Sequence, residues 1–292
     1  MKNMLFFIIL FSILSATTIH IPEDYPTIQN GINVSVDGDT VLIAQGIYYE
    51  NLILEKEIVL ASHAINDDLD SEWLTNENIT GTIISGAQEP SDPNKGSCLI
   101  IRGGGWNYGG NPQPEIIGLT FQDGDGTSML IDNCGVINRG RSGGAILMYK
   151  AYPTIMYNRF INNGHDTDNV RAGRGGSMGG AMGHYADDGV EFDEDRNFSS
   201  QNSNQNNNSN REIPDTLNIR NNYFENNASG DGENFYSHGY EGSINVSNSI
   251  FEDIDCETNS VNEFVLQSIE NEADYVQNEI SGNCIESNSF YV

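Results

Sequence analysis

The sequence predicts an all-β protein in which short parallel strands stack coil upon coil, with a short helix capping the N-terminal end. One recurring pattern carries most of this prediction: an apolar residue, a polar residue three positions later, an apolar residue five positions later, and then usually Asn or Asp. Copies begin at Ile155, Ile219, Val246, Tyr275 and Ile285. From the second copy to the fourth the steps are 27 and 29 residues, which is typical of stacked repeat architectures.

The cost of leaving apolar surface in water explains why this pattern predicts stacking. One coil cannot bury its apolar side chains alone, whereas coils stacked about 4.8 Å apart pair every strand with the coil above and the coil below. The inward Ile, Val and Phe side chains then form one continuous core. A segment from Ile116 keeps the apolar positions but carries Leu119 where the other copies have a polar residue. The fold class that follows is a parallel β-helix solenoid.

Asparagine recurs at the polar position of the pattern, as Asn158, Asn222 and Asn278. Stacked amides at one corner of each coil can hydrogen-bond to one another along the stack, and Asn tolerates the left-handed backbone of a turn. We therefore expect these residues to have a structural role and not a catalytic one.

The N-terminal region predicts one short amphipathic helix. Ile28, Ile32 and Val36 recur every four residues, Pro26 stands in the first turn, and the Asp-Gly pair at 37–38 ends the helix. A lone helix before a series of strands fits a cap that covers strand-edge groups which would otherwise pair with another molecule. Short apolar strands are expected next, at 40–44, 51–54 and 58–61.

These segments also carry a family resemblance. The stretch DYPTIQNGINVSVDGDTVLIAQGIYYENL, followed by GTIISG, SGGAILMY and PTIMYNRFINN, resembles the secreted right-handed parallel β-helix proteins of the pectin-lyase-like superfamily. The resemblance covers nearly the whole mature chain and implies a right-handed coil. It implies no single activity, because the superfamily includes lyases, hydrolases, esterases and phage tailspikes.

Residues 1–16 are predicted to be a signal peptide. Lys2 precedes an apolar run from Met4 to Leu14, which small residues follow. This run is shorter than the roughly 20 residues that span a bilayer. We therefore expect cleavage near Ala16, a protein that is secreted or held at the cell surface, and no membrane insertion after cleavage. Residues 17–292 would form the β-helix.

Two further features bear on the mature chain. A polar, low-complexity segment near 191–214 is expected to be a disordered loop that extends from one coil. The four cysteines lie too far apart in the sequence for a typical structural zinc site. Export permits disulfides, and Cys256 with Cys284 is the pair to test.

The charge excludes several classes of partner. The chain has 42 Asp and Glu against 13 Lys and Arg, a formal net charge of −29. Nucleic-acid binding depends on clustered Lys and Arg, so no nucleic-acid partner is expected. An anionic membrane would repel the chain for the same reason. Such acidity also keeps a secreted protein soluble, so by itself it implies no ligand, and we expect a monomer.

Acidic and basic residues in inserted loops are the catalytic candidates. The resemblance implies sites on an outer strand face among such loops, but the GHG and RIK segments of polygalacturonases are absent. A pectate-lyase-like reaction needs Ca²⁺ to neutralise a uronate and an Arg or Lys to take the α-proton. The alternative is a solvated surface loop. The catalytic candidates are Asp166, Asp168, Arg171, Arg174, Asp187 and Asp188.

Other residues are candidates for ligand binding. Asp123 and Asp125 in FQDGDG could hold Ca²⁺, which prefers carboxylate oxygens, although DGDG is also a common turn sequence. Trp106 and Tyr108 in a glycine-rich loop could stack on sugar rings, and an ordinary packed Trp is the alternative. The full set of carbohydrate-binding candidates is Arg102, Trp106, Tyr108, His165 and His184.

Three functions remain open from the sequence. The first is a secreted β-helix protein that contacts extracellular or cell-surface polysaccharide. The second is an enzyme, either a Ca²⁺-assisted polysaccharide lyase or a glycoside hydrolase that uses two carboxylates. The third is a structural surface adhesin fragment, since the chain ends within a repeat.

Overall fold

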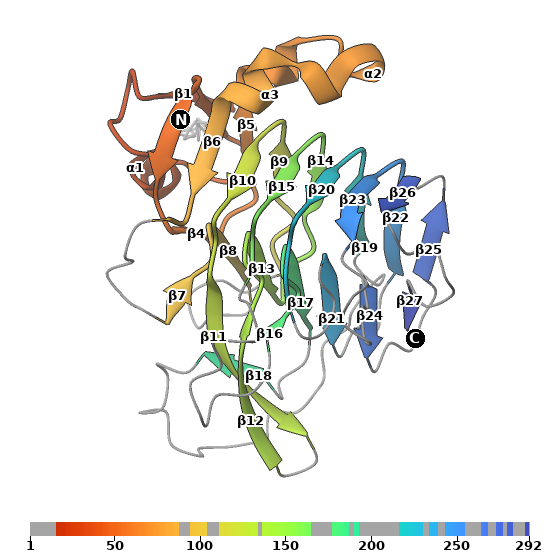
Figure 1. Ribbon diagram of the computed structural model, residues 1–292. Helices are drawn as coiled ribbons and strands as arrows, with labels where there is room; N and C mark the ends of the chain where they lie inside the picture. Colours follow the sequence, from red (N-terminus) through yellow and green to blue (C-terminus); the bar gives the residue numbers. More distant parts are fainter. Residues whose placement is uncertain are drawn as a thin grey trace, which may run out of the picture.

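Three long parallel β-sheets dominate the structure, a computed structural model in which the coloured strands progress from the N-terminal to the C-terminal end of the stack (Figure 1). Few helices are present, so the all-β class is confirmed. The structure describes residues 16–87, 94–103, 111–133, 136–164, 177–186, 190–192, 216–229, 234–238, 243–254, 264–267, 273–276, 279–282 and 290–291.

We call the three parallel sheets A, B and C. Sheet A contains β1 (Thr18–Ile21), β2 (Thr40–Ile43), β5 (Val59–Ser62), β9 (Glu115–Ile117), β14 (Thr154–Met156), β19 (Thr216–Arg220), β22 (Ser243–Ser247) and β25 (Ala273–Val276). Sheet B contains β3 (Gly46–Tyr49), β6 (Thr82–Ser85), β10 (Thr120–Gln122), β15 (Arg159–Ile161), β20 (Tyr223–Glu225), β23 (Ile250–Ile254) and β26 (Glu279–Gly282). Sheet C contains β4 (Leu52–Leu54), β8 (Leu99–Arg102), β13 (Ile146–Tyr149), β17 (Met182–Tyr185), β21 (Phe235–His238), β24 (Phe264–Gln267) and β27 (Phe290–Tyr291).

The order of strands along the chain is regular. After β1, the chain passes from sheet A to sheet B to sheet C and then back to sheet A, and it repeats this order through β27. Within each sheet, a strand pairs in parallel with the strand from the preceding pass and with the strand from the next. Residues far apart in the sequence are thereby brought side by side.

The register of these strands confirms the repeat pattern. Ile155 pairs with Ile219, Ile219 with Val246, and Val246 with Tyr275, so four copies begin at the same position of sheet A. Ile116 pairs with Ile155, which places the variant copy in the same row. The fifth copy, from Ile285, lies outside the described residues.

The apolar position five residues later forms a stack of rings inside sheet B. Phe121, Phe160, Phe224 and Phe251 are fully buried. Their ring centroids are 5.5, 4.9 and 4.6 Å apart along the row, in stacked arrangements. Because adjacent aromatic rings gain contact energy beyond their area burial, this stack stabilises one coil on the next.

The predicted asparagine ladder is present for the two copies that the structure describes. Asn158 and Asn222 are fully buried. The Asn222 side-chain oxygen accepts from the Asn158 backbone nitrogen at 3.0 Å, and Asn158 accepts from the Leu119 nitrogen at 2.9 Å. The ladder continues to Ser249, whose hydroxyl accepts from Asn222. Asn278 lies outside the described residues.

Two details differ from the sequence prediction. The left-handed residue is the one before each ladder position, Tyr157 or Asn221, with φ angles of 59° and 54°. A second ladder was not predicted. Asn163 accepts from the Gly124 nitrogen at 3.0 Å and donates to Asn227 at 3.1 Å, after β15 and β20 respectively.

Helix α1 (Ile28–Val34) packs against β1, β2 and β4 at the N-terminal end of the stack. The predicted helix is therefore present, but it is shorter than expected. Thr27 caps it, which leaves Pro26 before the first turn, and Val36 lies beyond its end with 51% exposure. Ile28 and Ile32 join the main hydrophobic core.

Three polar side chains fasten this helix. The Glu50 carboxylate accepts from the Ile28 and Gln29 nitrogens at the N-terminus, where negative charge stabilises a helix. Lys56 donates to carbonyl oxygens at the C-terminus, including that of Ile32 at 2.7 Å. The Gln29 amide bonds to both backbone groups of Ile53 in β4, at 2.8 and 3.1 Å. It therefore occupies part of the strand edge, as a neighbouring strand would.

Two insertions interrupt the coils, and neither was predicted. The first is helical and lies along one end of the strands of sheets A and B (Figure 1); it contains η1 (His63–Asn66), α2 (Leu69–Glu72), η2 (Trp73–Thr75) and α3 (Glu77–Gly81). The second is sheet D, built on a long antiparallel hairpin that extends away from the coils; it contains β7 (Lys95–Gly96), β11 (Gly126–Asn133), β12 (Val136–Ser142), β16 (Ser177–Met178) and β18 (Val190–Phe192).

Sheet D covers part of the outer face of sheet C. A second hydrophobic cluster forms there, in which Met129 of β11 packs with Ile100, Leu147, Tyr185 and Tyr236.

Glu191, which we expected in the disordered loop, lies in β18, while 193–214 lie outside the described residues. In the part of the chain that the structure describes, no helix is both long and apolar enough to cross a membrane.

Candidate functional site

Two predicted carbohydrate-binding residues lie on sheet C. The Arg102 guanidinium pairs with the Glu55 carboxylate, and its side chain is 37% exposed. His184 lies inside the coil and is fully buried; its Nδ1 is 2.9 Å from the Ser237 hydroxyl. Burial lowers the pKa of His184 to about 3. The structure therefore places His184 in the core, away from any surface that a polysaccharide could touch.

The two predicted Ca²⁺ ligands have other partners. Asp123 accepts from the Gln122 side-chain amide at 3.0 Å. The Asp125 carboxylate lies 2.8 Å from Arg141 Nη1. Among the residues described, no group of three or more His, Cys, Asp or Glu is placed to hold a metal ion.

The remaining predicted site residues lie outside the described residues, so the catalytic set of the enzyme hypothesis stays a prediction. They are Trp106, Tyr108, His165, Asp166, Asp168, Arg171, Arg174, Asp187 and Asp188, together with the proposed disulfide pair Cys256 and Cys284.

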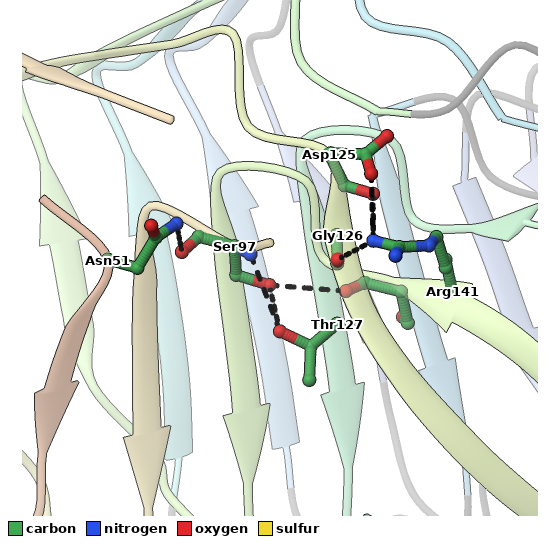
Figure 2. Close-up of polar contacts among 7 residues, drawn as sticks. Asn51, Ser97, Asp125, Gly126, Thr127 and Arg141 are labelled. Carbon is green, nitrogen blue, oxygen red and sulfur yellow. Dashed lines mark hydrogen bonds and ion pairs between the residues drawn. The ribbon is translucent and has the colours of Figure 1, made fainter. Parts of the chain in front are cut away.

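A polar network lies where sheet D joins the coils. Figure 2 shows Asn51 bonding to Ser97, Ser97 to Thr127, and Arg141 to both Asp125 and Gly126. The Ser97 and Thr127 hydroxyls are 2.8 Å apart and buried. Among the described residues, their hydrogen-bond partners are other hydroxyl and backbone groups, and neither an imidazole nor a carboxylate is among them.

Beside this network lies an open depression with about 140 Å³ of empty space. Asp125, Arg141 and Ser142 line it together with several glycines, and it is nowhere wide enough to enclose a water molecule. A Cβ at Gly144 would lie only 2.1 Å from the Gly180 carbonyl oxygen, so glycine is what allows the chain to pack closely here. We interpret the network as the attachment of the hairpin to the coils.

A different group of residues lies on the outer face of sheet B. Side chains alternate between the two faces of a strand. Because the stacked phenylalanines point inward, the residues on either side of each one point outward. Arg159 pairs with Tyr223, and Glu225 pairs with Glu252, across three successive strands. We call these four residues, together with Tyr157 and Trp73, the Tyr223 cluster.

Tyr223 is bonded to two carboxylates. Its hydroxyl oxygen is 2.7 Å from a Glu252 oxygen and 3.1 Å from a Glu225 oxygen. Burial, together with these hydrogen bonds and the negative charges, raises the pKa of Tyr223 above its usual range. The phenol is therefore protonated at neutral pH and can donate its one hydrogen to either carboxylate. All three side chains stay partly exposed.

Arg159 connects this strand face to the helical insertion. Its guanidinium lies 4.8 Å from the centre of the Tyr223 ring, and its Nη1 donates to the Leu74 carbonyl at 3.3 Å. Next to Leu74, the Trp73 ring meets the Tyr157 ring edge-on at 6.0 Å. The Tyr157 hydroxyl also donates to Asp70 at 3.3 Å. The insertion and three coils thus build one continuous surface.

The Tyr223 cluster presents three aromatic rings, one guanidinium and two carboxylates side by side. Aromatic faces can pack on the apolar faces of sugar rings, and the charged groups can bond to hydroxyls. We did not predict this cluster from the sequence. The signal was nevertheless present, because its strand residues flank the phenylalanine of each repeat copy. The contribution of Trp73 has no such signal.

Comparison of the chain with protein-family models, with curated protein sequences and with solved structures finds no match.

Proposed function

We propose that this chain is an exported, right-handed parallel β-helix of the pectin-lyase-like type that binds extracellular or cell-surface polysaccharide through the Tyr223 cluster. Three features support the fold part of the proposal: the A–B–C strand order, the parallel pairing and the resemblance of the motifs. The handedness follows from the strong preference of parallel crossover connections for the right-handed form.

One observation carries the functional part of the proposal. Trp73, Tyr157 and Tyr223 are half-buried aromatic residues of the helical insertion and the adjoining strand face. Trp73 contacts Tyr157, Arg159 packs over the Tyr223 ring, and two carboxylates lie within hydrogen-bond distance of the Tyr223 hydroxyl. Neighbouring strands lie about 4.8 Å apart, so the surface extends over several coils. An extended polymer suits such a face better than a small molecule does, because small ligands favour concave pockets.

Affinity measurements on single variants test this proposal. The purified mature chain is titrated with a panel of soluble neutral, acidic and amino polysaccharides by isothermal calorimetry. Trp73→Ala and Tyr223→Ala should each weaken binding about tenfold or more, since alanine removes a ring that the sugar contacts. Circular dichroism confirms that each variant is folded.

Tyr49→Ala is the matched control. Tyr49 is 55% exposed on β3, on the same sheet but outside the Tyr223 cluster, and its removal should leave affinity unchanged. Equal effects of Tyr49→Ala and Tyr223→Ala, or no binding to any member of the panel, would overturn the proposal. Shortening of any polymer during the titration would instead favour the lyase or hydrolase hypothesis.

A further inference from the structure

The Tyr223 hydroxyl can donate a hydrogen bond to only one of its two carboxylate neighbours at a time. The phenol has one hydrogen, yet its oxygen lies 2.7 Å from one carboxylate oxygen and 3.1 Å from another. It can donate to only one of them at a time. The second carboxylate then faces the lone pairs of the phenol oxygen. In addition, Glu225 and Glu252 lie directly opposite each other on adjacent strands, an arrangement in which like charges repel.

No cation of the described chain neutralises this pair. The guanidinium of this cluster belongs to Arg159, which lies over the Tyr223 ring and donates to the Leu74 carbonyl. Two ion pairs of the described residues, Arg102 with Glu55 and Arg141 with Asp125, involve neither Glu225 nor Glu252. The whole chain carries a net charge of −29, so its surroundings add negative potential to this surface.

We infer that the ligand of the Tyr223 cluster is a polysaccharide with free ammonium groups, that is, a polymer of unacetylated amino sugars. This inference rests on the proposed function. An ammonium group has three N–H donors, so it can bond to both carboxylates and to the phenol oxygen at once. The aromatic rings of Tyr223, Tyr157 and Trp73 then contact the same or neighbouring sugar rings.

The same charges disfavour two other ligands. A uronate polymer would bring further carboxylates to a surface that already has two. Calcium takes six to eight oxygen ligands, often from several carboxylates, whereas the described residues contain no group of three acidic or metal-binding side chains that could hold a metal ion. An ammonium group needs only hydrogen-bond acceptors, and the oxygens of Tyr223, Glu225 and Glu252 already present them.

The experiment compares two oligosaccharides with the same backbone, a hexamer of glucosamine and a hexamer of N-acetylglucosamine. The titrations are run at about pH 6, where the free amines are largely protonated. Calorimetry should give about tenfold tighter binding of the glucosamine hexamer, since hydrogen bonds to charged groups are the stronger ones. Glu225→Gln and Glu252→Gln should each remove most of the difference in affinity between the two hexamers.

Glu115→Gln is the control for general attraction between a polyanion and a polycation. Glu115 is exposed on the outer face of sheet A, and its substitution removes the same charge. If Glu115→Gln weakens binding as much as Glu225→Gln, the attraction is unspecific and the inference is wrong. The inference is also wrong if both hexamers bind equally and Tyr223→Ala abolishes the binding of both. That result would still support the proposed binding of polysaccharide by the Tyr223 cluster. If the chain binds none of the polysaccharides, the proposed function is wrong as well.

Discussion

The inner and outer faces of β15, β20 and β23 differ although they belong to the same strands. Inside, the three strands carry the same residue, and Phe160, Phe224 and Phe251 stack in one row. Outside, the residues that pair across these strands change from arginine to tyrosine, and from isoleucine to glutamate. The interior repeats because each coil must match its neighbours in shape, whereas the outer face carries no such constraint and is free to hold a binding site.

The largest expected effect comes from breaking the inner row. Phe224→Ala should lower the free energy of unfolding by about 3–5 kcal/mol, because it leaves a cavity between two stacked rings. Urea denaturation followed by circular dichroism measures this change. Tyr223→Ala, on the outer face of the same strand, should cost clearly less. Similar losses for both variants would contradict the difference between the two faces.

Acid should act on the interior through His184. Its pKa is about 3 in the folded chain and about 6.5 when unfolded. Between these values the unfolded state binds a proton that the native state does not, so stability falls as the pH falls below 6.5, by about 1.4 kcal/mol per pH unit. Urea denaturation from pH 7 to pH 4.5 should show a smaller loss for His184→Gln than for the wild type. Parallel curves for the two proteins would refute this prediction.

Removing one ladder amide should have an intermediate effect. The buried Asn222 side chain bonds to the backbones of Asn158, Ile155 and Arg220. Asn222→Ala should lower the free energy of unfolding by about 1–3 kcal/mol, because buried backbone groups lose their partners. Thermal denaturation measures the change. Asn245→Ala, at an exposed position of sheet A, serves as the control and should change stability by less than about 0.5 kcal/mol.

The smallest expected effect is a gain in stability on the outer face. Glu252→Gln keeps the shape of the side chain and removes one of two like charges that lie opposite each other. Stability should rise by about 0.2–1 kcal/mol, and the gain should shrink at high salt, which screens exposed charges. A loss of stability in Glu252→Gln would show that the carboxylate pair is already neutralised in the free protein.

Much of the arrangement of parallel strands was predictable because it depends on short-range spacing. The apolar and polar positions of the copies at Ile155, Ile219 and Val246 fall in register in sheet A as the pattern requires. Residues 28–32 formed the expected helix for a similar reason, since its apolar residues recur on one face. The helical insertion at 63–81 was not predicted, because its elements are three to five residues long and carry no clear period.

The candidate site was harder to predict. From the sequence we predicted that the catalytic residues would be charged residues close together in the chain, such as those at 165–174 and 187–188. The Tyr223 cluster instead assembles from residues that are up to 179 positions apart, Trp73 and Glu252. His184 was one of the predicted carbohydrate-binding residues. Because side chains alternate between the two faces of β17, the His184 side chain points into the core, next to Ser237.

The sequence by itself determined which residues repeat, which face of each strand is apolar and where a helix can cap the stack, because these depend on periodicity along the chain. Only the tertiary structure decided which outward side chains become neighbours, because parallel stacking pairs residues from different coils. The length of each insertion sets that pairing, and nothing in the spacing of one coil specifies it. The contact of Trp73 with Tyr157, beside the strand residues of the cluster, is therefore a property of the folded chain alone.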